Sequence, residues 1–570
     1  MMFLRSRRPL LLSLAMMLAL TGQNAAADTL VDNVDGMRFD RDGTVTRFAA
    51  MLVDDDGRVR QIYDQGQKLP RDVDYRLDGG GRTLLPGFVD AHLHVSDIGF
   101  AALTLDLSDT RSLAEARQRI ALYAEQNPER AWIIGRGWNQ EAWGLGQFPT
   151  AAQLDDLVTD RPVWLQRVDG HAGWANSAAL VAAGIDVTTA DPAGGRIERI
   201  GTSRQPAGVL VDNAMALIDA ALPPVRAKDR DLALEKAQQI LLARGITAVA
   251  DMGTTLNGWQ SYRRAGDLGR LQLRIVGYAA GTVDMEAIAG PGPTPWLYGD
   301  RLRLAGVKLY MDGALGSRGA WLKQPYADAA TQTGLPLLSG TQMRNLMSRA
   351  ALEGFQVAVH AIGDAANSEV LDAIAELNET YTGDRRWRIE HAQIVDPGDI
   401  ARFAQLGTVA SMQPQHQTSD WQMAQARLGP DRLTGAYAWA AMEDAGVPLA
   451  FGSDAPVEQP DVFAGLAAAI SRMDATGQPA GGWLAEQRIV LSTALAAYTS
   501  GAAWAQQAEG RFGSLREGEW ADFILLSANP FDTTPANLRA IEVLETWIAG
   551  RRVYAADKQQ TGNKQQTGTR

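Results

Sequence analysis

The sequence predicts an α/β protein in which a (β/α)8 barrel is flanked by a small β-sandwich built from both chain ends. Three observations lead to this fold class. Short apolar runs alternate with helical segments through the middle of the chain, as they do in parallel βα units. The two ends contain mainly β-type runs and turns. Polar residues follow several of the central runs, and strand ends meet at the catalytic face of such a barrel.

The first 27 residues are expected to be an export signal rather than part of the fold. Arg5, Arg7 and Arg8 precede an apolar stretch from Leu10 to Leu20, and Ala25-Ala26-Ala27 offers a small-residue cleavage site. This order of segments is typical of a secretory signal peptide and predicts export, into the periplasm of a Gram-negative bacterium. An uncleaved membrane anchor is disfavoured because the apolar stretch is short for a membrane span.

The composition of the chain excludes some classes of binding partner and of metal ligand. The chain has 570 residues, 46% of them apolar, and a formal net charge of −12. Removal of the signal would make that charge more negative, which argues against nucleic acid or an anionic membrane as partner. Because the chain has no cysteine, disulfides and thiolate ligands are excluded, and histidine, carboxylates and modified lysine remain as metal ligands.

Both ends of the chain consist of short strand-like runs separated by tight turns. Residues 28–86 contain runs such as VTRFAAMLV and RQIYD, and the Asp56-Gly57 pair between apolar runs is a hairpin signal. Residues 501–556 contain DFILLS and VLETWIAGRRVYAA, with a turn expected at Ala549-Gly550. We therefore expect one β-sandwich assembled from both ends. The last residues, 557–570, repeat KQQTG without an apolar residue and are expected to be a disordered tail.

The barrel is expected over residues 87–500. Strand-like runs such as GITAVADMG, LRLAGVKLYMDG and GFQVAVHAIGD alternate there with helix-like segments such as RDLALEKAQQILLAR. Residues of about 105–230 exceed what one βα unit needs, so we expect an insertion in that region. It is rich in Trp and Gly, and an aromatic segment above a barrel mouth is suited to cover a substrate.

Candidate metal ligands stand at the ends of successive strand-like runs. His92 and His94 form a His-x-His pair on one side of a strand, because side chains alternate with period two. His360 ends FQVAVH, His391 follows RIE, and Asp454 closes PLAFGSD. Imidazole and carboxylate hold Zn²⁺ and similar divalent ions, so this order predicts a metallohydrolase. A hydrogen-bonded core histidine is the alternative for each position taken alone.

Lys308 lies inside the otherwise apolar run AGVKLYMDG. A buried ammonium is costly without a partner, so this lysine needs an acid nearby or a lowered pKa. A neutral amine can add CO₂ to form an anionic carbamate that bridges two cations. The alternative is a salt bridge to Asp312 or Asp251. Asp454 likewise has two candidate roles, as metal ligand and as general base, with a helix N-cap as the structural alternative.

The motifs LLPGFVDAHLH, VKLYMDGALGSRGA, VHAIGDAAN, RIEHAQ and GSDAPVE together resemble the amidohydrolase superfamily. More narrowly, they resemble its family 3 branch, which includes N-substituted formamide deformylase. The resemblance runs from about residue 30 to 555. It implies a metal-dependent hydrolase on a barrel with two divalent ions, most simply zinc. Carried over, one ion would be held by His92, His94 and Asp454 and the second by His360 and His391, with carboxylated Lys308 bridging them.

The implied reaction is hydrolysis of a non-peptide amide-type C–N bond, as in an N-acyl or N-formyl amine, by a hydroxide held between the ions. Asp454 would take the proton and pass it to the departing amine, with Lys308 completing the catalytic centre. Three alternatives stay open: a mononuclear deaminase of the superfamily, an ester, carbamate or lactone hydrolase, and a non-catalytic regulatory or binding homologue. The expected partner is a small-molecule substrate, and analogy with the family also suggests a homodimer.

Three further residues are candidates for substrate binding. His171 in DGHAGWAN and His416 in QPQHQTSDW resemble pocket residues of this branch, with a structural role as the alternative for each. Trp138 is expected either at the pocket or in the packing of the insertion. Glu390 is left outside the site, because its side chain should point away from that of His391 on the same strand. Asp364 is interpreted as a helix cap or a partner of a ligand.

Overall fold

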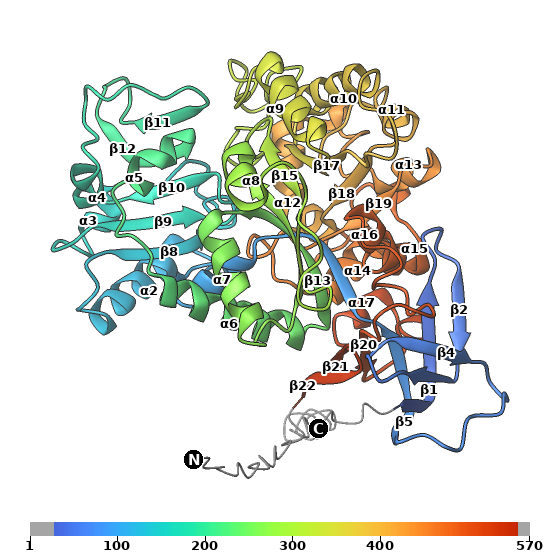
Figure 1. The fold of residues 1–570 in the computed structure, drawn as a ribbon. Coiled ribbons are helices and arrows are strands. Elements are labelled where there is room, and N and C mark those ends of the chain that lie inside the picture. The colour runs from blue at the N-terminus through green and yellow to red at the C-terminus, as the bar shows by residue number, and fades with distance from the viewer. Residues whose placement is uncertain (1–27, 557–570) are drawn as a thin grey trace, which may run out of the picture.

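The computed structural model describes residues 28–556. The expected signal peptide and the expected disordered tail lie outside these residues. Within them, Figure 1 shows three regions: a central barrel, a sheet formed by the chain ends, and a separate sheet beside the barrel. No helix of the described part of the chain is both long enough and apolar enough to cross a bilayer.

The barrel is built from eight strands, each parallel to its neighbours, and this part of the predicted fold is confirmed. The ends of the row also meet, since the backbone N–H of Asp454 donates to the carbonyl of His92 at 2.7 Å. The strands lie in the order β6 (Phe88–Leu93), β13 (Ile246–Thr254), β14 (Arg274–Ala280), β15 (Leu302–Tyr310), β16 (Gln356–Ala361), β17 (Arg388–His391), β18 (Val409–Met412) and β19 (Leu449–Phe451).

Both faces of these strands are buried, which explains why the sequence shows continuous apolar runs there rather than alternation. Val89, Ala91 and Ala358 belong to a cluster of mostly small side chains, while Val249 and Ile275 pack in the larger core with the helices. The helices that cover the barrel include α1 (Val95–Ala101), α6 (Ala227–Ala243), α7 (Leu256–Asp267), α8 (Gly281–Ala289), α9 (Gly340–Leu352), α10 (Asp364–Asn378), α11 (Ile400–Gln405), α12 (Pro414–Leu428), α13 (Trp439–Asp444), α14 (Val462–Ser471), α15 (Leu491–Ala497) and α16 (Ser500–Ala505).

Strands from both chain ends share one sheet of eight strands. β5 pairs with β1 in parallel on one side and with β20 in antiparallel on the other. The pairing gives one continuous sheet, so the second layer that a sandwich requires stays a prediction. The strands are β1 (Thr29–Phe39), β2 (Val45–Phe48), β3 (Ala50–Val53), β4 (Val59–Tyr63), β5 (Tyr75–Pro86), β20 (Phe523–Leu526), β21 (Val543–Ile548) and β22 (Arg551–Ala555), with α17 (Pro535–Leu538) between β20 and β21.

The chain between β6 and β13 forms a second, smaller sheet of six strands. Figure 1 shows this sheet beside the barrel, and we call it the insertion sheet. Its own core contains Trp138 and Trp174, whose ring centroids are 6.2 Å apart. The elements are β7 (Leu105–Asp106), α2 (Leu113–Gln126), β8 (Ile133–Trp138), α3 (Ala152–Asp155), β9 (Val163–Arg167), β10 (Ala172–Ala175), α4 (Ser177–Ala182), β11 (Gly195–Arg199), β12 (Pro206–Asp212) and α5 (Ala216–Asp219).

Candidate metal centre and active site

The candidate ligands converge because parallel strands bring their carboxyl ends to one face of the barrel. His92 is the penultimate residue of β6, and Lys308, His360 and His391 lie at or near the ends of β15, β16 and β17. Asp454 follows β19 by three residues. The ring centroids of His92 and His391 are 4.7 Å apart, and those of His360 and His391 are 4.6 Å apart. Strands that are distant in the sequence therefore deliver these side chains to one place.

Asp454 lies at the middle of this group. Its Oδ1 atom is 3.2 Å from Nε2 of His94 and 3.4 Å from Nε2 of His92, and its Oδ2 atom is 3.2 Å from Nε2 of His416. Burial raises the pKa of the Asp454 carboxyl, but His92, His416 and His94 outweigh that effect and hold the pKa well below its usual value. The side chain is therefore a carboxylate surrounded by imidazoles.

His92 is held in one orientation by a residue that the sequence interpretation left out. Its Nδ1 atom lies 2.7 Å from Oε2 of Glu390, which is in turn bonded to Arg388 through Oε1 at 2.7 Å. Burial lowers the pKa of His92 to about 4. The neutral ring donates from Nδ1 to the carboxylate, so the lone pair of Nε2 faces Asp454. A carboxylate behind a histidine ligand is a common way to orient it toward a metal.

The expectation for Glu390 was thus wrong, and the backbone gives the reason. Strand alternation predicts that Glu390 and His391 point to opposite faces. However, His391 has φ +75° and Ala392 has φ +44°, both in the left-handed region. The chain leaves the strand at His391, so Glu390 points into the barrel while His391 still reaches the site. Asp454 also has positive φ, at +55°. Such backbone strain is found where side chains must be placed for function.

Lys308 is buried on β15 with its Nζ atom 3.3 Å from Nε2 of His92. Among residues 28–556, no carboxylate oxygen lies within 4.0 Å of that nitrogen, so the alternative of a salt bridge to Asp312 or Asp251 is not realised. Both acids are engaged elsewhere: Asp312 accepts from backbone N–H groups such as that of Gly363, and Asp251 from the hydroxyl of Tyr262. Burial lowers the pKa of Lys308 to about 8, which increases the share of neutral amine near neutral pH.

The donor set fits a divalent cation. One ligand atom each from His92, His391 and Asp454 lie within 4.8 Å of one another. Burial holds the pKa of His360 and of His391 well below the usual value, so both rings are neutral. Oδ1 of Asp454 is buried and accepts no hydrogen bond from any residue of the described chain. A buried carboxylate together with the neutral imidazoles of His92, His360 and His391 forms a donor set suited to a Zn²⁺-type ion.

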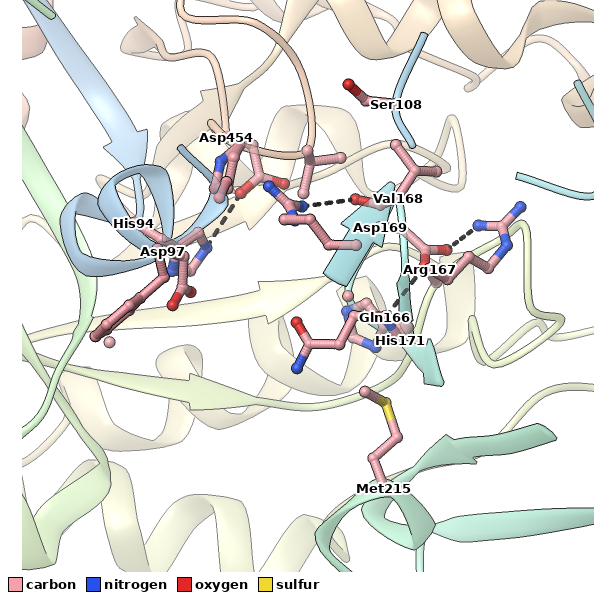
Figure 2. A pocket seen from close by; sticks show the side chains of 18 of the residues that line it. His94, Asp97, Ser108, Gln166, Arg167, Val168, Asp169, His171, Met215 and Asp454 are labelled. Carbon is pink, nitrogen blue, oxygen red and sulfur yellow. Dashed lines mark hydrogen bonds and ion pairs between the residues drawn. The ribbon is translucent and has the colours of Figure 1, made fainter. Parts of the chain in front are cut away.

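The site opens into a cavity of about 2150 Å³ between the barrel mouth and the insertion sheet. His94, His171, His416 and Asp454 line it, and Figure 2 shows His94, Asp454 and His171 there. The cavity is large enough for a small-molecule substrate. Trp138 does not line it: the indole is fully buried and donates from Nε1 to the carbonyl of Leu165 at 2.6 Å. The structure thus places Trp138 in the packing of the insertion sheet.

His171 is oriented by Asp212, another residue that was not predicted. Nδ1 of His171 lies 2.7 Å from Oδ1 of Asp212, and its ring centroid is 5.0 Å from that of His360. A Cβ atom at Gly313 or Gly319 would lie 2.6 or 2.7 Å from Oδ2 of Asp212. These two glycines of the DGALGSRG segment therefore make room for the Asp212 carboxylate, a signal that could be interpreted only with the fold known.

Comparison with known proteins places this site in a family. The model of the amidohydrolase family, Amidohydro_3, matches residues 77–554. The chain therefore belongs to the amidohydrolase family, as its motifs predicted, and it is a hydrolase of carbon–nitrogen bonds whose family implies a divalent metal.

Similar proteins agree with this assignment. A protein of Bacillus subtilis named putative amidohydrolase YtcJ is 36% identical over 479 residues, which cover 83% of this chain and 89% of that protein. The N-substituted formamide deformylase of Arthrobacter pascens is 29% identical over 496 residues, covering 83% and 89% of the two chains. A crystal structure of an uncharacterized metal-dependent hydrolase from Pyrococcus furiosus has a TM-score of 0.67 and 27% identity, and covers 88% of this chain and 99% of its own.

Proposed function

We propose that the protein hydrolyses the C–N bond of an N-acyl or N-formyl amine that is not a peptide. One observation carries this proposal: Oδ1 of Asp454 accepts no hydrogen bond among the described residues and lies 3.4 Å from Nε2 of the neutral His92 ring, in a site that opens into a cavity large enough for an organic substrate. The similarity to a formamide deformylase supports an amide as the bond that is cleaved.

The proposal includes two divalent ions, most simply zinc. His92, His94 and Asp454 would hold one ion, and His360 and His391 the other, with Lys308 as a bridging carbamate. The ring of His391 lies close to His92, a proposed ligand of the first ion, and to His360, a proposed ligand of the second ion. This closeness supports two ion positions that lie next to each other. The depressed pKa of Lys308 supports carbamate formation, since only the neutral amine adds CO₂. Bound ions would acidify a water molecule and polarise the scissile carbonyl.

The side chains of this chain have separate tasks in the proposed reaction. Asp454 accepts the proton of the attacking water at Oδ1, while His416 holds Oδ2 and so fixes the plane of the carboxylate. The same carboxylate then passes the proton to the departing amine nitrogen. His171, held by Asp212, faces the cavity on the His360 side of the site and contacts the substrate there. The insertion sheet covers the reacting groups and limits access of bulk water.

The test combines metal content with turnover. Purified protein is analysed for metal per chain by elemental mass spectrometry, and initial rates are measured on a panel of N-formyl and N-acetyl amines. We expect about two equivalents and measurable release of amine. Asp454→Asn should lower kcat by about 100-fold or more, the usual range for a general base. Asp109→Asn, which removes a carboxylate at the cavity rim, serves as the control.

Each failure has a defined meaning. One equivalent of metal with turnover would contradict the two-ion site but not amide hydrolysis. Near-native turnover by Asp454→Asn would contradict the role of Asp454. Absence of turnover on every amide, with ester or deaminase activity present, would contradict the proposed reaction.

We also propose that the protein is exported to the periplasm and acts there as a homodimer. The sequence of residues 1–27 supports export. Cell fractionation with and without these residues tests the first point, and light scattering of the purified mature chain tests the second. Retention of the full chain in the cytoplasm, or a monomeric mass, would contradict the corresponding statement.

A further inference from the structure

One face of the insertion sheet forms a wall of the cavity. Residues alternate on its strands, so that Ile134, Arg136 and Gln166 line the cavity while Ile133 and Leu165 pack in the core behind them. Arg136 of β8 and Gln166 of β9 are direct neighbours in the strand register. The sheet therefore presents a guanidinium and an amide side by side to the space above the metal centre.

Arg136 has no acidic partner in the part of the chain that the structure describes. Its Nη2 atom donates to the carbonyl of Val168 at 3.2 Å, and no carboxylate oxygen lies within 4.0 Å of its nitrogens. Burial lowers the pKa of Arg136, an effect opposed by Asp97, Asp106 and Asp454, so those acids are close enough for their charge to act on the guanidinium. An arginine stays protonated in such a setting. A charged, partly buried and unpaired group remains.

Other charged side chains of the cavity wall have partners within the protein or are exposed, which distinguishes Arg136 from the other basic groups there. Arg167 is paired with Asp169, as Figure 2 shows. The Asp212 carboxylate is engaged by His171. Arg130, which also lines the cavity without an acidic partner, is exposed and donates to Asn127 at 3.3 Å. Among the arginines that line the cavity in the described chain, Arg136 is thus the partly buried one that has no carboxylate within 4.0 Å.

We propose that Arg136 determines specificity by binding a carboxylate of the substrate, with Gln166 donating a second hydrogen bond. Guanidinium groups bind carboxylates in a planar, charge-assisted geometry that other side chains do not reproduce. The preferred substrates are then N-acyl or N-formyl amines that carry a carboxylate, such as N-acyl amino acids. This inference rests on the proposed amide hydrolysis, and it names the class of amide.

A matched pair of substrates tests the inference. N-formyl-L-phenylalanine and N-formyl-2-phenylethylamine differ only in the carboxylate. We expect the wild type to favour the first in kcat/KM by about 10-fold or more, the usual effect of a hydrogen bond to a charged group. Arg136→Gln should abolish that preference by raising KM for N-formyl-L-phenylalanine far more than KM for the neutral substrate. Arg136→Lys should restore part of it, and Arg130→Gln, at the rim, should keep it.

A second measurement does not depend on turnover. Isothermal titration of the metal-free protein compares 3-phenylpropanoate with 3-phenylpropanamide, and tighter binding of the acid should be lost in Arg136→Gln. Absence of any preference in the wild type, or an equal preference in Arg136→Gln, overturns the assignment of Arg136. Hydrolysis of neither formamide while the acid still binds through Arg136 would instead contradict the proposed reaction and leave the anion site in place.

Discussion

Nδ1 of His92 and Oε2 of Glu390 are 2.7 Å apart, and both side chains are fully buried inside the barrel. Glu390 is also bonded to Arg388, whose Nη2 donates to the carbonyl of Ala91 at 2.7 Å and to Ser411 at 3.0 Å. Arg388 outweighs the effect of burial and holds the pKa of Glu390 far below its usual value. The Glu390 carboxylate is therefore ionised over the pH range in which the protein is studied. Because it holds Nδ1 of His92, Nε2 is the nitrogen of that ring that can bind a metal.

We expect Glu390→Gln to weaken metal binding by about 10- to 100-fold, the usual cost of losing the partner of a histidine ligand. The amide keeps the shape of the side chain but removes the charge that orients the imidazole. Competition with a chromogenic zinc chelator measures the affinity, and circular dichroism verifies that the variant is folded. Glu458→Gln is the control, since its carboxylate lies 3.6 Å from His416 rather than beside a predicted ligand. Equal zinc affinity of wild type and Glu390→Gln would contradict this role.

Lys308 offers a spectroscopic prediction. Protein incubated with zinc and ¹³C-bicarbonate should give a carbamate carbon signal, because the amine is buried and its pKa is lowered to about 8. Lys308→Arg keeps the charge but cannot form the carbamate, so the signal should vanish and the second equivalent of metal should be lost. A signal of equal intensity in Lys308→Arg would assign it to another lysine.

A buried ion pair joins the barrel to the sheet of the chain ends. Nε of Arg274, on β14, lies 2.5 Å from Asp522, which immediately precedes β20, and both side chains are at most 1% exposed. Asp522→Ala leaves a buried guanidinium without its partner and should lower the free energy of unfolding by about 3–5 kcal/mol. Chemical denaturation measures this change.

The control for that experiment is the pair of Arg82 and Glu545, 3.0 Å apart, whose side chains are 30% and 13% exposed. Glu545→Ala should cost about 1 kcal/mol or less, as exposed pairs do. The double variant Arg274→Met with Asp522→Leu should recover much of the loss, because neither charge then remains buried. If Asp522→Ala costs no more than Glu545→Ala, the two parts of the molecule are not coupled through this pair.

The carboxyl group of Asp420 predicts that the stability of the protein depends on pH. This carboxylate accepts a hydrogen bond from the hydroxyl of Tyr437 at 2.8 Å, and burial raises its pKa from 3.8 to about 6. Between these values the folded state binds a proton that the unfolded state releases. The contribution to stability is therefore present below about pH 4 and is lost as the pH rises through about 6.

Asp420→Asn removes this pH dependence because the amide does not ionise. Relative to wild type, the variant should gain up to about 3 kcal/mol between the two pH values, since one pKa unit corresponds to about 1.4 kcal/mol. Thermal unfolding at several pH values measures the difference. A difference between the two proteins that is constant across this range would show that Asp420 does not titrate as stated.

The sequence was sufficient to predict the barrel and its metal-binding face. The six histidines and Asp454 stand at or near strand ends, and strand order follows from the alternation of β-type and helical runs. The roles of Glu390 and Asp212 could not be predicted. The first depends on the positive φ of His391, and the second on space left by two glycines 100 residues away in the chain. Neither a backbone reversal nor a long-range contact is visible in local periodicity.

Trp138 is a residue for which the sequence leaves two locations open. Aromatic residues in an insertion above a barrel predict either a pocket wall or a separate core, and the sequence alone does not distinguish them. The decision is made by a break in β-strand alternation within the insertion sheet, where the register shifts between Arg136 and Trp138. Arg136, two residues earlier, faces the cavity, whereas Trp138 packs against Trp174. Gly137, between them, has φ +93° and interrupts the regular alternation at that point.

The pairing of β5 with β20 has a consequence for the time at which the molecule can fold. These two strands are separated by more than 400 residues, and the end of β5, from Thr83 to Pro86, pairs with β20 along one edge. During synthesis, every chain that ends before β20 leaves this edge of β5 without its partner strand, and an unpaired edge can pair with other chains. Completion of the native sheet therefore requires that the last strands of the chain have been made.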